Sequence, residues 1–437
     1  MPSSPDAPRP RLLAVGAIER DNFGDLLYVH LLEHYAAQSH DISLGAPVLP
    51  TVELPLDREV RLWPDELDRE SFDVAWTVGG EVGGTPPEYA YLTAHGTSAH
   101  RAMMKASDLE RDEILAAAMG GTIIDPPYLP RPALSARSTG ARLVLNSIGL
   151  SGIPREPLWR RPSLEAALRE ASFIGVRDRA SSAALDDLGI AHRLAPDAAH
   201  VVARVRPVDR QSDGPLLVHL SRQAFEKVTP EEWAESLHEA FRSVPGEIRL
   251  FLAGLAPAHD SLSRAKDLRD RLARLVGTGR AVTVSETRSV WDRVEEIAGA
   301  RAWIGGSLHG RIIASAYGVP RVSLAKPKVD AYARDWDPEQ PYGVGPRTLA
   351  ESVARALATP TPPRDDLATA ADANYRAALA SLSAPVPDDL EQARRRAHRE
   401  ELERLRTHAR RLDRRLAART TEVDRLRGEA RPGAGHD

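Results

Sequence analysis

From residue 11 to about residue 362, short apolar segments of the chain alternate with stretches of helical periodicity. Such alternation is typical of βα units, in which parallel strands are joined by helices that cover the sheet. The chain is therefore predicted to have an α/β fold. The segments of its first half that we expect to form strands are residues 12–16, 74–78, 143–148, 173–176 and 192–194.

A second series of elements follows a polar, turn-rich stretch at residues 205–214, which we interpret as an interdomain linker. Its expected strands are residues 216–220, 248–253, 282–285, 302–304 and 321–324, and its expected helices are residues 230–242, 261–276, 290–298 and 310–317. Two Rossmann-like domains result, residues 12–204 and 205–362. Because open parallel sheets bind ligands at the carboxyl ends of their strands, the cleft between the domains is the expected site.

Both ends of the chain depart from this pattern. Residues 1–11, rich in Pro and Ser, and residues 431–437 are expected to be disordered, and the Ala-rich residues 363–386 are expected to be helical. Residues 387–430 carry apolar side chains at coiled-coil spacing, interrupted at Arg419: Leu402, Leu405, Ala409, Leu412, Leu416, Val423 and Leu426. We favour self-association through this coiled coil, and hence a homo-oligomer. A solvated helix and docking to another protein remain alternatives.

Charge and composition exclude several classes of protein. The 58 basic and 62 acidic residues give a net charge of −4, which argues against binding nucleic acid through bulk positive charge. The absence of Cys excludes disulfides, thiolate nucleophiles and zinc–cysteine sites. No apolar stretch predicts a signal peptide or a transmembrane segment, so we expect a cytoplasmic protein, with attachment to a membrane surface left open.

Two glycine-containing turns follow strands of the first domain. Asp25 closes the sequence Asn22-Phe23-Gly24-Asp25, where it can cap a helix or act as a base or hydroxyl anchor. Gly80 and Glu81 belong to a run of four glycines around one acid, whose backbone amides can approach a ligand closely. Neither sequence matches a nucleotide-binding fingerprint, so a turn with only a structural role remains an alternative to a ligand-binding turn in both cases.

Cationic residues are expected at the ends of three further strands. Arg177 follows a strand of the first domain and suits a carboxylate or phosphate, although a surface pair with Asp178 is the plain alternative. His309 stands at the start of a helix after two glycines and is a candidate general acid or base, with Arg311 two residues further on. Lys328, one of only five lysines in the chain, follows the next strand.

In these residues the sequence resembles the polysaccharide pyruvyl transferase family over about residues 12–360. The motifs that carry the resemblance are NFGD from Asn22, GGEVGG from Gly79, GVRD from Gly175, Pro196-Asp197, SLHGRIIASAYGVP from Ser307 and KPKVDAY from Lys326. Their order and spacing, rather than any one of them, make the resemblance specific.

The resemblance implies a two-domain fold similar to GT-B glycosyltransferases. It also implies transfer of a pyruvyl group from phosphoenolpyruvate to hydroxyls of a sugar or polysaccharide precursor, forming a ketal and releasing phosphate, without a metal or other cofactor. The family's arginine, histidine and lysine correspond to Arg177, His309 and Lys328. Ser307 stands where well-known members carry Arg, and we expect Arg311 to replace that cation.

Residue type, cleft position and resemblance together assign the roles. We expect His309 to protonate the enol carbon, and Arg177 and Lys328 to hold the donor's anionic groups. Arg311 is expected to support the phosphate, with Asp25 or Glu81 as partner of the acceptor hydroxyl. Two alternatives remain: a GT-B-like nucleotide-sugar glycosyltransferase, and a non-catalytic coiled-coil assembly module on the same scaffold.

Overall fold

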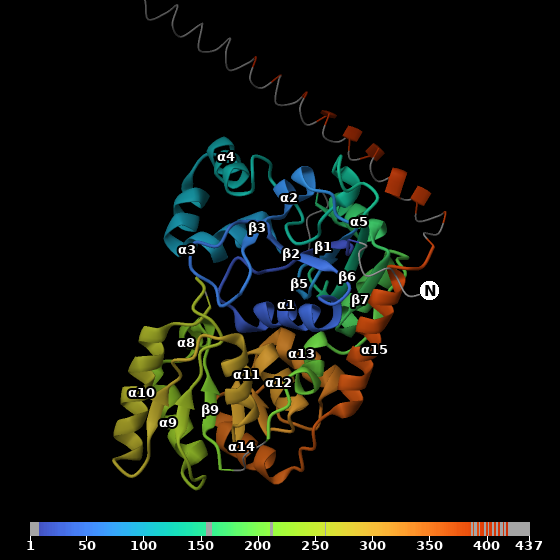
Figure 1. Cartoon of the computed structure of the whole chain (residues 1–437). Helices are drawn as coiled ribbons and strands as arrows, with labels where there is room; N and C mark the ends of the chain where they lie inside the picture. Colours follow the sequence, from blue (N-terminus) through green and yellow to red (C-terminus); the bar gives the residue numbers. More distant parts are fainter. Residues whose placement is uncertain are drawn as a thin grey trace, which may run out of the picture. The chain divides into compact units, whose positions relative to one another are not determined.

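The computed structural model describes residues 8–153, 160–209, 213–257, 259–385 and scattered positions between 388 and 417. Residues up to Pro385 belong to one compact unit, and a second unit begins at Val386. The first unit contains two parallel sheets that follow each other along the chain, which confirms the predicted α/β fold (Figure 1).

The first sheet has eight strands in the order β3-β2-β1-β4-β6-β7-β8, with β5 beside β6. Alternate residues of its central strand β1 face opposite sides, as the pleat of a strand requires. Leu12 and Ala14 pack with α1, whereas Leu13 and Val15 pack with α2. Its elements are β1 (Arg11–Val15), α1 (Phe23–Ala36), β2 (Asp41–Ala46), β3 (Val60–Leu62), α2 (Trp63–Arg69), β4 (Val74–Thr77), β5 (Gly80–Glu81), α3 (Pro87–Lys105), α4 (Asp108–Ala118), β6 (Arg142–Gly149), α5 (Arg161–Glu170), β7 (Phe173–Val176), α6 (Arg179–Asp187) and β8 (Arg193–Leu194).

The second sheet has five strands in the order β11-β10-β9-β12-β13. Leu216 and Val218 of β9 face a core formed with α9, α10 and α14, whereas Leu217 belongs to the cluster on the other face, which contains α11, α12 and α1. Its elements are β9 (Leu216–His219), α8 (Arg222–Lys227), α9 (Pro230–Phe241), β10 (Ile248–Leu250), α10 (Leu262–Val276), β11 (Val282–Val284), α11 (Val290–Ala298), β12 (Ala302–Gly305), α12 (Leu308–Ala316), β13 (Arg321–Ser323), α13 (Pro327–Trp336) and α14 (Leu349–Ala358).

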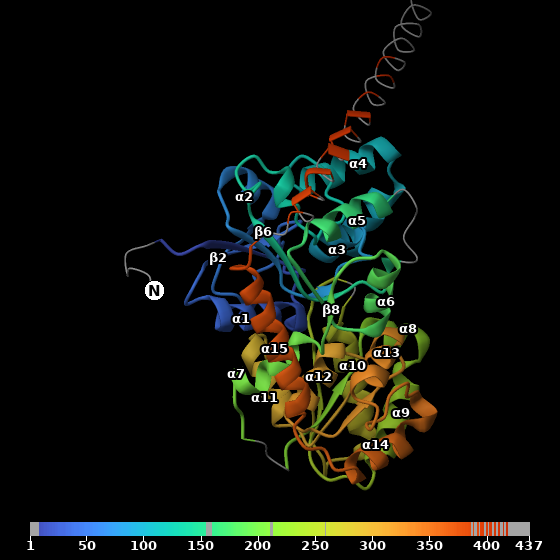
Figure 2. The ribbon, with the colours of Figure 1, turned by 90° about the vertical axis from the view of Figure 1, so that its right-hand side faces the viewer.

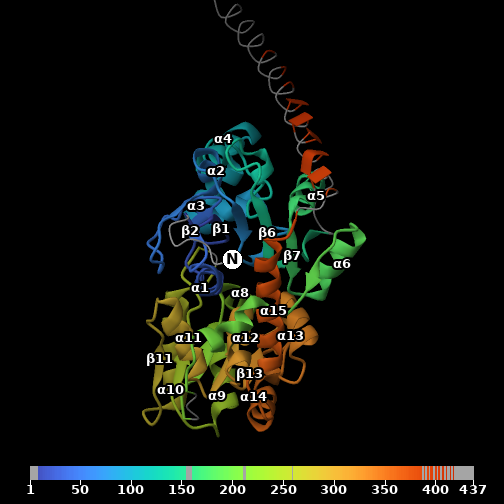
Figure 3. The same cartoon turned by 45° about the vertical axis from the view of Figure 1, so that its right-hand side comes forward.

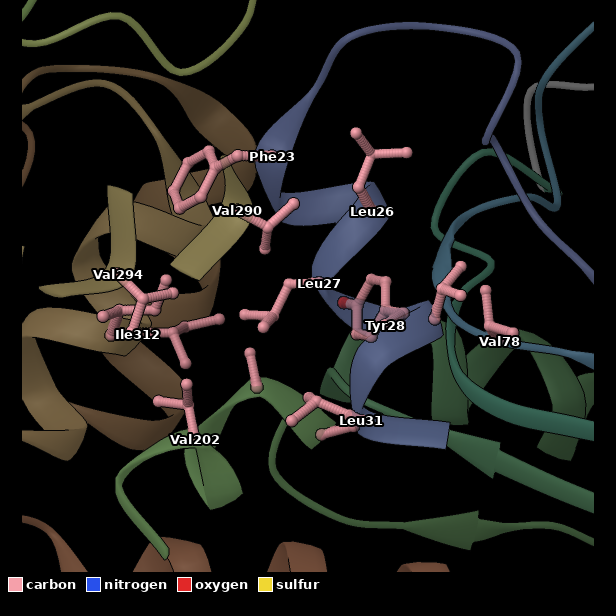
Figure 4. Close-up of a cluster of buried hydrophobic side chains, with 14 of the residues drawn as sticks. Phe23, Leu26, Leu27, Tyr28, Leu31, Val78, Val202, Val290, Val294 and Ile312 are labelled. Atoms are coloured by element: carbon pink, nitrogen blue, oxygen red, sulfur yellow. The ribbon is translucent and has the colours of Figure 1, made fainter. Parts of the chain in front are cut away.

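Helix α1 lies between the two sheets and belongs to the cores of both (Figure 1). Leu27 of α1 faces Val294 of α11 and Ile312 of α12, and Phe23 packs on the same side (Figure 4). A short connection, η3 (Ala198–Val201) and α7 (Val202–Val205), contributes further buried side chains to this apolar cluster. The two sheets therefore share a hydrophobic interface.

A buried ion pair fixes the same interface at its edge. Arg293 of α11 donates to both carboxylate oxygens of Asp21, at 2.8 and 3.3 Å, and the backbone amide of Leu255 donates to the same carboxylate at 3.0 Å. Phe23 also donates its backbone amide to the carbonyl of Ala253 at 2.9 Å. Polar contacts thus join the loop before α1 to the loop after β10.

The Ala-rich segment is helical, as predicted, and returns to the first sheet. It forms α15 (Asp365–Ser381), which Figures 2 and 3 show running from the second sheet's side of the unit to the first. Asn374 donates to Asn146 of β6 at 2.7 Å, and Tyr375 stacks on Tyr35 with ring centroids 4.3 Å apart. The last helix thereby covers both halves of the unit.

Most predicted strands occur within one to three residues of their expected ends, but three short strands were not predicted. β2 and β3 were missed because they are half polar or very short, and β5 lies within the glycine-rich run that we interpreted as a loop. For residues 85–140 the sequence leaves two interpretations open, an insertion that caps the cleft and a solvated excursion, and predicts a helix at about residues 109–119. The segment forms α3, α4, which confirms that helix, and a buried segment around Tyr128.

The terminal predictions are mostly untested. Residues 1–7, most of residues 387–430 and residues 431–437 lie outside the described residues. The described positions between 388 and 417 are helical, and the coiled coil stays a prediction. Among the helices of the described chain, none combines the length and apolarity that crossing a membrane requires.

Replacing Arg293 by Ala should destabilise the unit by about 3 kcal/mol, because it leaves the Asp21 carboxylate buried without its cation. Urea unfolding monitored by circular dichroism measures this loss. Arg222→Ala is the matched control, since its pair with Glu226 is solvent-exposed and should contribute less than about 1 kcal/mol. Equal midpoints for the two variants would contradict the role given to the interface pair.

Candidate active site

The hydroxyl of Tyr28 is the meeting point of side chains from both halves of the unit. It lies 2.6 Å from Asp197 Oδ2, 2.9 Å from Arg177 Nη1 and 3.0 Å from His309 Nε2. All four side chains are buried, with at most 6 % exposure. We call Tyr28, Arg177, Asp197 and His309 the interface network.

Local structure explains how each member arrives there. Arg177 follows β7, and Asp197 follows β8, where it caps η3 by accepting from the amide of Ala199 at 2.9 Å. Both therefore stand at the carboxyl edge of the first sheet, as expected of Arg177. Tyr28 projects from the second turn of α1, a position that apolar periodicity alone assigns to the core.

His309 belongs to the first turn of α12, as the sequence predicted to within one or two residues. Ser307 is the N-cap, and its hydroxyl accepts from the backbone amide of Gly310 at 3.3 Å. An Arg cannot cap in this way, so the residue that departs from the family pattern has a structural role of its own. Ser307 also lines the pocket described below.

Burial lowers the pKa of His309 to about 4, and the positive charges of Arg177 and Lys328 act in the same direction. Asp197 and Asp25 oppose this shift but do not outweigh it. The imidazole is therefore neutral at neutral pH in the absence of a ligand. Burial acts to raise the carboxyl pKa of Asp197, but the charge of Arg177, together with His309 and the hydrogen bonds from Tyr28 and the Ala199 amide, lowers it below its ordinary value, so Asp197 is ionised.

A pocket of about 420 Å³ lies between the carboxyl edges of the two sheets, directly beside this network. Its lining includes Asp25, Glu81, Ser307, His309 and Lys328, five of the residues selected from the sequence. Thr85 and Pro86, which precede α3, and Tyr89 in its first turn also line the pocket. That segment thus borders the predicted cleft.

Two lysines that flank Pro327 supply the pocket's free positive charge. Within the described part of the chain, neither Lys326 nor Lys328 forms an ion pair with a carboxylate. Lys328 is accessible to solvent, yet the walls of the pocket surround it, and this partial desolvation lowers its pKa to about 8. Arg177 adds to the lowering, whereas Glu81 opposes it.

Asp25 and Glu81 face the pocket as carboxylates with different partners. Asp25 accepts from Arg20 Nη2 at 3.1 Å and from Asn22 at 2.8 Å. Burial acts to raise its carboxyl pKa, but the positive charge of Arg20, with smaller effects of His309 and Lys328, leaves that pKa below its ordinary value. Glu81 accepts from Ser151 at 3.2 Å and lies 3.7 Å from Arg177 Nη2.

Gly80, the other residue expected from this run, stands beside Asp25. A Cβ built at Gly80 would lie 3.7 Å from Asp25 Oδ1, and its φ of 95° lies in the left-handed region that favours glycine. Gly80 therefore lies in β5 beside Asp25 and, unlike Glu81, is not among the residues that line the pocket.

The structure corrects two expectations about arginines. Arg311 points away from the pocket: it donates to Ser323 and to the carbonyls of Pro341, Asp337 and Gln340 behind α12, so it is no phosphate contact. Arg177 lies behind the pocket wall and not on it, with 1 % of its surface exposed. Its Nη2 is nevertheless buried without a hydrogen-bond partner in the described part of the chain.

Several pocket residues were missed by the sequence interpretation. His219 lies 3.2 Å from both oxygens of Asp260, whose Oδ2 also accepts from the amide of Ala253 at 2.6 Å. His259 is next to this pair, and burial lowers its pKa to about 4. His219 could have been found from the sequence by its position at a strand end. It is the last residue of β9, the first strand of the second sheet, and His309 similarly follows β12, the fourth strand along the chain.

A second cavity, of about 470 Å³, lies at the edge of the second sheet beside β11. Lys266, Arg269 and Arg288 line it together with Arg293, which the pair with Asp21 occupies. It is slightly larger than the pocket beside the network but contains no member of it. Volume alone is therefore a poor guide to the site, and the convergence of titratable groups identifies the pocket at His309 instead.

Gly24 keeps α1 close to the imidazole, and Gly24→Ala should displace His309. A Cβ at Gly24 would lie 1.8 Å from His309 Nδ1, which no side chain tolerates. We expect a lower melting temperature and the loss of any reaction that uses His309. Gly140→Ala is the control, because nothing lies within 4 Å of its Cβ position; equal effects of the two substitutions would contradict the close approach.

Two solved structures with a similar fold are those of UDP-GlcNAc 2-epimerases. UDP-GlcNAc 2-epimerase of Methanocaldococcus jannaschii, crystallised with UDP-GlcNAc and UDP, is 13% identical over 85% of this chain and 99% of its own, with a TM-score of 0.47. A putative UDP-N-acetylglucosamine 2-epimerase of Listeria monocytogenes is 10% identical over 87% and 99%, with a TM-score of 0.49. These similarities say nothing about what this chain binds. A search of curated sequences found no match.

The sequence itself matches one family model, that of polysaccharide pyruvyl transferase, over residues 22–325. This range begins at the N-cap of α1 and ends after β13, so it contains Tyr28, Arg177, Asp197 and His309. It covers more than half of the chain and includes both carboxyl edges that form the pocket. The chain therefore belongs to the polysaccharide pyruvyl transferase family.

Proposed function

We propose that this protein transfers the pyruvyl group of phosphoenolpyruvate to two hydroxyls of a sugar or polysaccharide precursor. The observation that carries the proposal is the pairing of free lysines with a neutral histidine in one pocket. Lys326 and Lys328 carry ammonium groups that form no ion pair with the residues the structure describes, and His309 lines the same cavity. Such a set suits a small donor that carries a carboxylate and a phosphate and must receive a proton.

The reaction that we propose has two additions to the same carbon. One acceptor hydroxyl bonds to C2 of phosphoenolpyruvate while C3 takes up a proton and becomes a methyl group. A second hydroxyl then bonds to C2 as the C2–O bond to phosphate breaks, which gives the ketal and inorganic phosphate. The two acceptor hydroxyls lose two protons in total. One is matched by the proton added to C3, and the other leaves with the phosphate.

His309 is the proposed proton donor to C3. Its imidazole is neutral when no substrate is bound, so the proton must arrive when the substrates bind. A dianionic or trianionic donor beside the ring stabilises the imidazolium and raises its pKa, in the direction opposite to burial and to the nearby cations. His309 is thereby protonated when the donor is in place.

The anionic groups of the donor have separate proposed partners. Lys328, with Lys326 beside it, holds the phosphate and stabilises it as it leaves. Arg177 lies behind the pocket wall, so the donor carboxylate reaches it only by displacing the side chain of Glu81, which lines the pocket. The existing Arg177–Glu81 pair is long, at 3.7 Å, and Arg177 Nη2 has no hydrogen bond in the described part of the chain, so both features favour this exchange. Asp25, held ionised by Arg20, is the proposed acceptor of a sugar hydroxyl's hydrogen bond.

Other features of the proposal concern the whole protein. It includes no metal and no further cofactor, and it places the enzyme in the cytoplasm, at or near the membrane where polysaccharide precursors of the cell envelope are assembled. The tail at residues 387–430 would form a homo-oligomer. Removal of residues 388–437 tests this: a monomer with full turnover supports an assembly role for the tail, whereas an unchanged oligomer contradicts it.

A nucleotide-sugar glycosyltransferase on the same scaffold is the principal alternative. Thermal-shift measurements separate the two, since a ligand that binds the folded state raises the melting temperature. Stabilisation by phosphoenolpyruvate and not by nucleotide sugars supports the proposal. Stabilisation by nucleotide sugars alone contradicts it.

Incubation with phosphoenolpyruvate and a panel of lipid-linked or activated sugars should release phosphate and add the mass of a pyruvyl ketal to one acceptor. His309→Ala should lower kcat by about 100-fold or more, because the proton donor is lost. Arg311→Lys, in contrast, should act mainly on stability, since Arg311 contacts only protein groups behind α12. Full turnover by a folded His309→Ala variant would refute the assignment.

The KM for phosphoenolpyruvate should rise as the pH increases through about 8. Lys328 is charged below its pKa, which burial lowers to about 8, so donor binding is strong at pH 7 and weakens toward pH 9.5. In Lys328→Arg the guanidinium stays charged throughout this range, and the KM should vary much less with pH. A wild-type profile that is flat from pH 7 to 9.5 would contradict the role of Lys328.

A further inference from the structure

The hydrogen-bond partners of the Tyr28 hydroxyl leave only one arrangement of protons. A phenol has one proton to donate and accepts through its lone pairs. Arg177 can only donate, and the carboxylate of Asp197 can only accept. The Tyr28 proton therefore lies on the 2.6 Å contact to Asp197 Oδ2, and the hydroxyl oxygen accepts from Arg177 Nη1.

This arrangement determines the proton position on His309. Since the Tyr28 proton is used by Asp197, the 3.0 Å contact between His309 Nε2 and the hydroxyl requires an N–H on Nε2. In a neutral imidazole Nδ1 then carries the lone pair. Within the described residues Nδ1 has no hydrogen-bond partner, and the adjacent Gly24 has no side chain to cover it.

We propose that Tyr28 and Asp197 are positioning residues that hold His309 as the Nε2–H tautomer, so that Nδ1 is the atom that takes up and delivers the proton. The catalytic part of this inference rests on the proposed function, whereas the tautomer does not. Nδ1 gains a proton when the donor binds and passes it to C3, and Nε2 keeps its N–H to Tyr28 throughout. The step breaks the Nδ1–H bond, forms the C3–H bond and returns the ring to neutral.

Several features suit the network to this task. Burial and T-shaped packing against His309, with ring centroids 5.2 Å apart, restrict the orientation of the Tyr28 ring. Asp197 accepts from Arg177, Tyr28 and the amide of Ala199, so its own orientation is determined by three donors. Loss of the hydroxyl would leave a buried Nε2–H without a partner, which favours rotation of the ring or the other tautomer.

Two-bond ¹H–¹⁵N correlation spectra of protein labelled with ¹⁵N-histidine measure the tautomer directly. The signal of His309, identified by its absence in His309→Ala, should show a protonated Nε2 and an unprotonated Nδ1 in the wild-type protein at pH 7. Tyr28→Phe keeps the ring in the apolar cluster of Figure 4 and removes only the hydroxyl. It should shift the population away from Nε2–H and lower kcat about tenfold or more, with a smaller change in KM.

Tyr375→Phe is the matched control, because that buried hydroxyl has no hydrogen-bond partner in the described part of the chain. It should leave both the His309 signal and kcat unchanged. A wild-type proton on Nδ1, or a Tyr28→Phe spectrum identical to that of the wild type, would overturn the proposal. If the tautomer is as expected but no pyruvyl transfer occurs, the positioning stands and the proposed function fails.

Discussion

The structure depends on the placement of one helix, α1, between two sheets that both need it. Its apolar side chains complete the face of the first sheet and simultaneously pack on α11 and α12 of the second. The two halves therefore cannot lose their mutual contact without exposing a shared core. Because Tyr28 projects from the same helix, the packing that joins the sheets also delivers the hydroxyl that joins Arg177, Asp197 and His309.

A buried network of ionised groups is stable only if its charges and hydrogen bonds compensate their desolvation. The Arg177–Asp197 pair achieves this for itself, and a neutral His309 adds no further charge. Among the described residues, Arg177 Nη2 still has no hydrogen-bond partner, and it lies 3.7 Å from Glu81 Oε2. Lys326 and Lys328, which form no ion pair in the described part of the chain, add positive charge to the pocket beside this network.

The sequence predicted the strand ends well, because a buried parallel strand is a short apolar run and its last residue points to the binding edge. Arg177, His309 and Lys328 were found in this way. Tyr28 was missed because a tyrosine among leucines on an apolar helix is predicted to lie in the core. Its ring does lie there, and only its hydroxyl belongs to the network. Arg311 was misassigned since the sequence gives no sign of which side of α12 an arginine faces. The return of α15 to the first sheet depends on long-range packing that periodicity does not encode.

The same geometry explains why glycine is needed where the two halves meet. His309 approaches α1 so closely that any side chain at Gly24 would occupy the position of Nδ1, and Gly254 approaches the carbonyl of Asp21 in the same way. Both contacts lie within a few residues of the Asp21–Arg293 pair. A movement that separated the sheets would break this pair and withdraw His309 from Tyr28 together. The proposed Nε2–H tautomer of His309 thus depends on the contact between the two sheets. While the sheets remain in contact, Tyr28 holds the imidazole in one orientation at the pocket.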